Sequence, residues 1–149
     1  MDQLEQLLRD ATTIELVDWP GADVPATLHR AGYLVVGHEP DGFKRYHVAA
    51  EAGRSLSFAL ADGAFLISDA IPALPEKVDI VGTYRPPEEQ LELARDAARI
   101  GARDFRIEPG EGTSDEARAF ATQAGMHFVE GEGIADAVRR LGIAVAGAD

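Results

Sequence analysis

The second half of the chain alternates short apolar runs with amphipathic segments, and this alternation limits the fold more than any other feature. Three runs, VDIVGTY, DFRIEPG and MHFVEG, have the length and composition of buried strands. The segments between them have helical periodicity and end at Gly101 and Gly125, where helices are expected to stop. Strands and helices in this order form right-handed βαβ units around a parallel sheet.

The helix starts in this half carry recognisable signals. Pro87 falls in the first turn of one helix, and Glu88 places negative charge at the positive end of its dipole. Thr113 and Glu116 have the spacing of a capping box at the next helix. The last segment, IADAVRRLG, is predicted to be a helix that ends at Gly142.

The first half follows the same order. Leucines at helical spacing over residues 4–11 predict an amphipathic first helix, and TIELVDW predicts a strand. A second helix over residues 24–31, ended by Gly32, leads into the apolar run YLVVGHEP. We therefore predict one three-layer, doubly wound α/β domain over residues 1–149, with a sheet of about five parallel strands.

Residues 41–75 fit two structures. In SLSFALADGAFLIS, apolar residues alternate from Leu56 to Leu60 and Asp62-Gly63 is a turn dipeptide, which favours a β-hairpin. Leu56 and Leu60 are also four positions apart, so a helix ended by Gly63 is the alternative. The hairpin is the preferred interpretation.

The composition excludes several classes of function. A formal net charge of -12 disfavours binding to nucleic acid or to anionic lipid, because both depend on clustered Lys and Arg. The start of the chain, MDQLEQLLRDA, lacks the positive charge of a signal peptide, and no apolar run has the roughly 18 residues of a membrane span. We expect a cytoplasmic protein that binds neither nucleic acid nor membranes.

Cysteine and histidine usage argues against two kinds of chemistry. The chain has no cysteine, which excludes disulfides and thiolate nucleophiles. Its four histidines have no metal-binding spacing, so no metal site is expected. We also predict no catalytic residues. An enzyme that uses His38, beside Glu39, as an acid or base is the least favoured alternative.

Two strand-to-helix junctions have distinctive residues. Arg85-Pro86 follows VDIVGTY and opens a helix, and Glu108-x-Gly110 follows the next strand, before an acidic helix start. Together with the order of elements, these junctions resemble those of the predicted CoA-binding protein family. In that family the first junction is Arg-Pro and the second is usually Gln-x-Gly, so this chain has Glu108 in place of Gln.

The resemblance extends upstream. HRAGYLVVGHEP is similar to the Gly-Tyr strand of the family that ends in Asn-Pro, with Glu39-Pro40 in this chain. It covers most of residues 4–143 if residues 41–64 are treated largely as an insertion. The resemblance implies a Rossmann-like domain, related to the N-terminal domain of the succinyl-CoA synthetase alpha subunit. It also implies a small-molecule-binding domain for CoA or another adenine nucleotide.

The first turn of such a domain holds a phosphate on a Gly-x-Ser type loop. Here the corresponding residues are Asp18-Trp19-Pro20. Pro20 has no N–H to donate and Asp18 repels an anion, so we interpret this turn as a degraded phosphate loop. Gly21, at the start of the following helix, still offers a weak anion site.

The remaining candidates each have a functional and a structural interpretation. Arg85 would hold a phosphate bidentately, or pair with an acid at the helix start such as Glu89. Glu39 would accept hydrogen bonds from ribose hydroxyls, or face solvent. Glu108 would bond an adenine amino group or a hydroxyl, or cap a helix, and Trp19 would stack on adenine or pack. The predicted ligand-binding residues are Trp19, Gly21, Glu39, Pro40, Arg85, Pro86, Glu108 and Gly110.

A second function from another class remains open. The Asp18-Trp19-Pro20 turn and the negative charge both disfavour polyanionic ligands. The alternative is therefore a degenerate Rossmann-like domain that has lost its ligand and acts through protein contacts, for example as a homodimer. An exposed apolar face between Phe43 and Ile67 would favour it.

Overall fold

Eight strands form one sheet in the computed structural model, which describes residues 2–53 and 56–145. The strand order is β4-β5-β3-β2-β1-β6-β7-β8. The strands are β1 (Thr13–Val17), β2 (Leu34–Glu39), β3 (Gly42–Ala49), β4 (Leu56–Ala59), β5 (Phe65–Ile71), β6 (Ile80–Thr83), β7 (Asp104–Ile107) and β8 (His127–Glu130). Five neighbouring strands, β2, β1, β6, β7 and β8, pair in parallel, as the sequence predicts.

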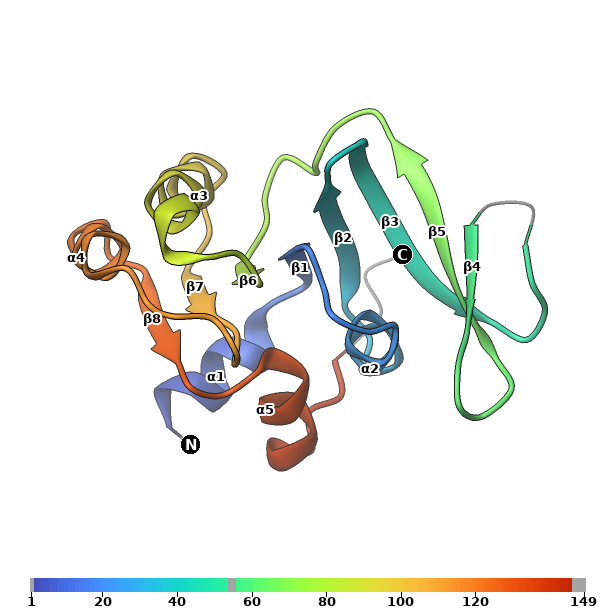
Figure 1. The fold of residues 1–149 in the computed structure, drawn as a ribbon. Coiled ribbons are helices and arrows are strands. Elements are labelled where there is room, and N and C mark those ends of the chain that lie inside the picture. The colour runs from blue at the N-terminus through green and yellow to red at the C-terminus, as the bar shows by residue number, and fades with distance from the viewer. Residues whose placement is uncertain (1, 54–55, 146–149) are drawn as a thin grey trace.

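Helices cover both faces of the parallel part of the sheet (Figure 1). The helices are α1 (Gln3–Asp10), α2 (Asp23–Arg30), α3 (Pro87–Arg99), α4 (Asp115–Gln123) and α5 (Ile134–Leu141). Residues of α1, α2 and α5 pack in one apolar cluster with one face of the sheet. Residues of α3 and α4 pack in a second cluster with the other face. This arrangement confirms the three-layer Rossmann-like fold.

Strands β3, β5 and β4 extend the sheet in antiparallel pairing. β4 and β5 are the two arms of a hairpin around Asp62-Gly63, so the hairpin interpretation is confirmed over the helix. β3 was not predicted, because GFKRYHVA mixes charged and apolar residues on both faces. Its Tyr46 is nonetheless fully buried and belongs to the core.

The start of α4 differs from the predicted capping box. Ser114 is the N-cap, and its Oγ accepts a hydrogen bond from the backbone N–H of Ala117 at 3.1 Å. The Thr113 hydroxyl instead donates to the carboxylate of Glu130 at the end of β8. The helix therefore begins one residue later than the Thr113-Glu116 pattern indicates.

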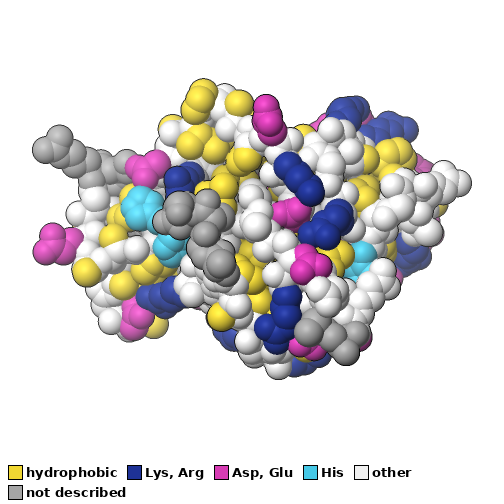
Figure 2. Space-filling view, turned by 180° about the vertical axis from the view of Figure 1, so that it is seen from behind, with side chains coloured by type: hydrophobic (Ala, Val, Ile, Leu, Met, Phe, Trp, Pro, Cys, Tyr) yellow, Lys and Arg dark blue, Asp and Glu magenta, His cyan; other side chains and the backbone are white. Residues whose placement is uncertain are grey.

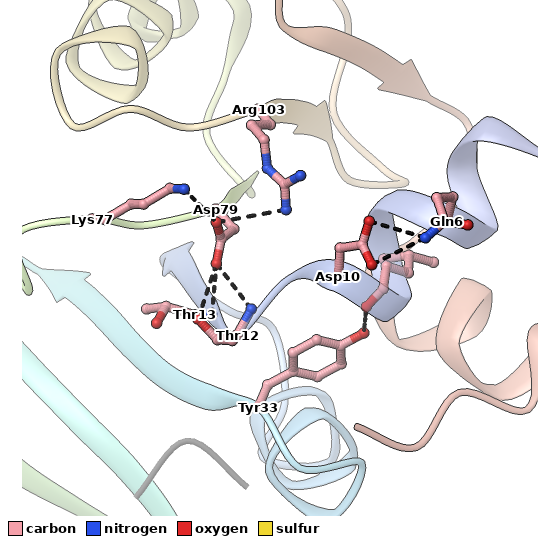
Figure 3. A network of polar contacts seen from close by, with 9 residues as sticks. Gln6, Asp10, Thr12, Thr13, Tyr33, Lys77, Asp79 and Arg103 are labelled. Carbon is pink, nitrogen blue, oxygen red and sulfur yellow. Dashed lines mark hydrogen bonds and ion pairs between the residues drawn. The ribbon is translucent and has the colours of Figure 1, made fainter. Parts of the chain in front are cut away.

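A buried carboxylate joins three segments at the amino edge of the sheet (Figure 3). Asp79 accepts hydrogen bonds from the backbone N–H groups of Thr12 and Thr13, at 2.9 and 3.2 Å. Lys77 and Arg103 lie 3.7 Å from its other oxygen. Burial alone would raise the pKa of Asp79, but these hydrogen bonds outweigh burial and lower the pKa. Asp79 thus fixes the start of β1 against the start of β6.

The surface carries charges of both signs. On the face that Figure 2 shows, Lys and Arg side chains lie beside Asp and Glu side chains, with hydrophobic side chains between them. Leu56, on the edge strand β4, is 62% exposed, the only large hydrophobic side chain so exposed among the described residues. No helix in the described part of the chain is long and apolar enough to cross a membrane.

Candidate functional site

The carboxyl ends of the parallel strands meet at one edge of the sheet, where the chain order reverses between β1 and β6. Open α/β sheets bind ligands at such a switch point. Two adjoining hollows lie there. The first, here called the crevice pocket, has a volume of about 230 Å³ and is lined by residues including Asp18, Glu39, Pro40 and Arg85. The second, here called the turn pocket, has a volume of about 240 Å³ and is lined by Asp18, Trp19, Pro20, Tyr84, Pro109, Gly110 and Glu111.

Arg85 follows β6 and contacts Asp18 at the end of β1. It precedes Pro86, the N-cap residue of α3, whose backbone is extended. Its guanidinium donates to Glu89 Oε2 at 2.7 Å and to Asp18 Oδ2 at 3.2 Å. Both hydrogen bonds raise the pKa of Arg85, and the hydrogen bond to Glu89 has the larger effect. Arg85 is the only Lys or Arg among the eight lining residues of the crevice pocket, all of which the structure describes. Its guanidinium is therefore already paired with two carboxylates.

Asp18 occupies the turn that replaces a phosphate loop. Its φ of 66° lies in the left-handed region, which Asp and Asn tolerate better than most residues. Its carboxylate accepts a hydrogen bond from the backbone N–H of Trp19 at 3.1 Å, and its own backbone N–H donates to the carbonyl of His38 at 3.4 Å. The turn is thus closed by its own side chain, and this side chain lines both pockets.

Trp19 is anchored to the antiparallel extension. Its ring makes edge contacts with Tyr46 and Phe58, at centroid distances of 5.8 and 5.2 Å. It also lines the turn pocket together with Gly110. Contacts with the buried Tyr46 ring and the partly buried Phe58 ring hold the indole in place, so it forms a fixed wall of the pocket.

Gly21 lies just before α2. A Cβ at this position would be 3.1 Å from the carboxylate of Asp23, which is in the first turn of the helix. Asp23 already places negative charge at the positive end of the helix dipole. An anion at Gly21 would therefore compete with this carboxylate.

Glu39 and Pro40 form the β2 side of the crevice pocket. The Tyr46 hydroxyl donates a hydrogen bond to Glu39 Oε2 at 2.7 Å, which orients the carboxylate. His38 lies beside them and packs on Phe43, with the ring centroids 4.9 Å apart. Glu39 is half-buried and Pro40 is exposed. The pocket thus offers a positioned carboxylate on one side and Arg85 on the other.

Glu108 is in the core beneath α5. Its carboxylate is fully buried and accepts the backbone N–H of Ile134, at 3.0 and 3.2 Å from its two oxygens. A Cβ on Gly82 would lie 2.8 Å from Glu108 Oε1, so this glycine makes room for the carboxylate. Burial raises the pKa of Glu108 to about 7. Glu108 therefore caps α5, whose N-cap Gly133 has no side chain to do so.

The structure places the predicted residues in four groups. Glu39, Pro40 and Arg85 share the crevice pocket, and Trp19 and Gly110 share the turn pocket. Glu108 lies in the core, and Gly21 and Pro86 are the helix-start residues next to these hollows. No group of three or more His, Asp or Glu side chains in the described ranges is placed to hold a metal ion.

Two residues were not singled out from the sequence. Tyr84 lines the turn pocket and directly precedes Arg85, so its place at a strand end was a usable signal. Glu15 lies in the middle of β1 and is 5% exposed. A carboxyl group inside an otherwise apolar strand was its signal.

Comparisons with known proteins agree with this architecture. A solved structure from Thermus thermophilus, described as cell-free ID.343, has 20% sequence identity and a TM-score of 0.65, covering 93% of this chain and 96% of that chain. At this identity the likeness shows the fold alone. No curated protein matches. The family model described as CoA binding domain matches residues 17–137. Because this match covers more than half of the chain and spans the whole crevice, the chain belongs to the CoA-binding domain family.

Proposed function

We propose that this chain is a non-catalytic binding domain that takes CoA or another adenine nucleotide in the crevice pocket. The observation that carries the proposal is the placement of Glu39 and Arg85 on opposite sides of the switch point between β1 and β6. One is a hydrogen-bond acceptor at the end of β2, and the other is a guanidinium at the end of β6. Ribose hydroxyls and phosphates need these two groups respectively.

The nucleoside part of such a ligand suits the acidic lining. Ribose hydroxyls and the adenine amino group donate hydrogen bonds, and Glu39 is held by Tyr46 in a position to accept them. Val17 and Leu93 supply apolar wall for the base. The carboxylates that disfavour a phosphate therefore favour the neutral, donor-rich half of the same molecule.

To bind the phosphate part of the ligand, Arg85 must exchange one of its carboxylate partners for the phosphate. Exposed ion pairs contribute little to stability, and both the guanidinium and its partners are partly exposed. A phosphate can accept two parallel hydrogen bonds from a guanidinium and displace Asp18 or Glu89. We infer that binding replaces an internal ion pair by an ion pair with the ligand.

Calorimetric titration of the ligand-free protein with adenosine, ADP and CoA tests this proposal. Arg85→Gln should weaken ADP and CoA binding roughly tenfold or more, because it removes a charge-assisted contact, and should leave adenosine binding unchanged. Arg95→Gln, on α3 and paired with Glu92, is the matched control and should leave the affinities for all three ligands unchanged. If none of the three ligands binds the wild-type protein, the proposal fails.

A degenerate domain that acts through protein contacts is the second candidate. Its support is the pairing of Arg85 with two carboxylates, together with Asp18 and Glu111 in the turn pocket. Sedimentation analysis of the ligand-free protein separates the two functions. A stable homodimer combined with no nucleotide binding would favour this candidate.

A further inference from the structure

Glu15 is a buried carboxyl group for which the proposed nucleotide site has no use. It lies in the middle of β1, between Ile14 and Leu16, and its side chain is on the face of the sheet that α3 covers. Only 5% of the residue is exposed. No hydrogen bond or ion pair joins its carboxyl group to any other part of the chain that the structure describes. An unpaired, buried carboxyl group is unusual, because its ionised form is costly to bury.

This carboxyl group lines a cavity. The cavity, here called the Glu15 pocket, has a volume of about 210 Å³ and lies between the sheet and α3. Its walls are mainly apolar, with side chains that include Val17, Phe43, Leu74, Val81, Leu93 and Ile100. Residues 72–79, which lead from β5 to β6, contain no helix that would fill this space. It adjoins the crevice pocket, with which it shares Val17, His38 and Leu93.

The charged groups around the pocket leave Glu15 without a cation. Asp96, on α3, is at the rim, and its negative charge adds to burial in raising the pKa of Glu15 to about 7. Arg99 is also at the rim, but its guanidinium forms an ion pair with Asp96 and lies 3.8 Å from a carboxylate oxygen of Glu92. His38 lines the side toward the crevice pocket.

We propose that the Glu15 pocket binds a small organic ammonium ion, that is, an apolar group carrying one protonated amine. The apolar part would pack against the walls formed by Val81 and Leu93, and the ammonium would donate to the Glu15 carboxylate. An anionic ligand would be repelled by Glu15 and Asp96. A neutral apolar ligand would leave the carboxyl group unpaired. The amine is the ligand class that satisfies both the walls and the carboxyl group.

Binding of an amine is coupled to the ionisation of Glu15. The complex holds Glu15 as a carboxylate, whereas the empty pocket keeps it half protonated near pH 7. Affinity should therefore rise roughly tenfold between pH 6 and pH 8, while the amine itself stays protonated. His38, Asp96 and Arg99 also face the pocket, so the part due to Glu15 is isolated by comparison with Glu15→Gln.

Titration of the full chain with benzylamine and with benzyl alcohol, followed by NMR of the backbone amides, tests the proposal. Wild-type protein should bind benzylamine at least tenfold more tightly than the alcohol, with shifts along β1 and α3. Glu15→Gln should remove this preference and the pH dependence, and Glu116→Gln, an exposed change on α4, should retain both. Equal binding of amine and alcohol, no binding of the amine, or amine binding unchanged in Glu15→Gln would each overturn the proposal.

A second measurement does not need a variant. The carboxyl carbon of Glu15 in wild-type protein can be followed by pH titration with and without benzylamine. The amine should lower the pKa of Glu15, since it stabilises the carboxylate. An unchanged pKa at saturating amine would contradict the proposal even if Glu15→Gln does not fold.

Discussion

Asp18 Oδ2 lies 3.2 Å from Arg85 Nη1, and this contact joins the end of β1 to the end of β6 across the switch point of the sheet. The two residues are 67 positions apart in the chain. In a phosphate-binding turn the place of Asp18 would be taken by an uncharged group. The ion pair therefore puts an internal anion where a ligand phosphate would otherwise contact Arg85.

Asp18→Asn is expected to strengthen the binding of ADP and CoA by about two- to fivefold, since exposed ion pairs of this kind are weak competitors. Asparagine tolerates the left-handed backbone of this position, and its side-chain oxygen can still accept the hydrogen bond from the backbone N–H of Trp19, so the turn is retained. Calorimetry with ADP and adenosine measures the effect. An equal increase in the affinity for adenosine, which has no phosphate, would show that the gain in ADP affinity does not come from the phosphate.

The protein is expected to lose stability as the pH rises from about 4.5 to about 7. Burial raises the pKa of Glu15 from 4.5 to about 7, so in this range the native chain keeps a proton that the unfolded chain has lost. Between pH 5 and pH 8 the wild-type protein should lose about 2–3 kcal/mol more free energy of unfolding than Glu15→Gln. Urea denaturation at both pH values measures this. Parallel pH profiles for the two proteins would show that Glu15 ionises normally.

Glu108 should add to the same trend, because its pKa is also raised to about 7. Glu108→Gln keeps an oxygen that can accept the Ile134 N–H and removes the charge. It should flatten the stability profile above pH 5. Glu108→Ala also removes the carboxyl group, so its profile should be equally flat but lie about 1–3 kcal/mol below that of Glu108→Gln at every pH, through the lost cap. Equal profiles for the two variants would argue against the capping role.

Gly37→Ala should destabilise the protein by about 1–3 kcal/mol, because a Cβ there would lie 2.1 Å from the hydroxyl oxygen of the buried Tyr46. Displacing Tyr46 would also release Glu39, so nucleotide affinity should fall with stability. Gly53→Ala is the control, since its Cβ would meet Ile67 at an ordinary 3.4 Å. Thermal and urea unfolding compare the two variants.

Asp79→Ala should cost about 1–3 kcal/mol of stability, because the N–H groups of Thr12 and Thr13 would lose their acceptor in a buried place. Asp79→Asn keeps an acceptor oxygen and should cost less. Asp115→Ala changes a side chain that is 93% exposed and serves as the control. A loss for Asp79→Asn as large as for Asp79→Ala would assign the effect to the charges of Lys77 and Arg103 instead.

The parallel core was predictable because its signals are local. Each strand is a short apolar run, and each later helix has a glycine just after its end, as at Gly101 and Gly125. β3 has no such pattern: Arg45 and Tyr46 are neighbours on opposite faces, and only tertiary packing buries the tyrosine. The hairpin between β4 and β5 was found through its Asp62-Gly63 turn.

The crevice was predictable to a lesser degree. Parallel strands necessarily bring their carboxyl ends together, so the order of strands along the chain is enough to place Glu39 and Arg85 near one another. Successive side chains of a strand point to opposite faces of the sheet. A shift of one residue therefore decides whether a strand-end side chain faces the crevice or the core. Ile107 packs with α3 and α4, and Glu108 therefore turns to the opposite face, beneath α5.

The pairing of β1 with β6 also has a consequence for folding kinetics. It joins Ile14 to Ile80, a wider separation along the chain than any other strand pair in the described sheet, whereas β3, β4 and β5 pair with close neighbours in sequence. Loop-closure entropy therefore weighs most heavily on the pair of strands that carries the crevice. Substitutions in β5 that loosen the intervening segment should slow the assembly of a binding site that β5 does not line.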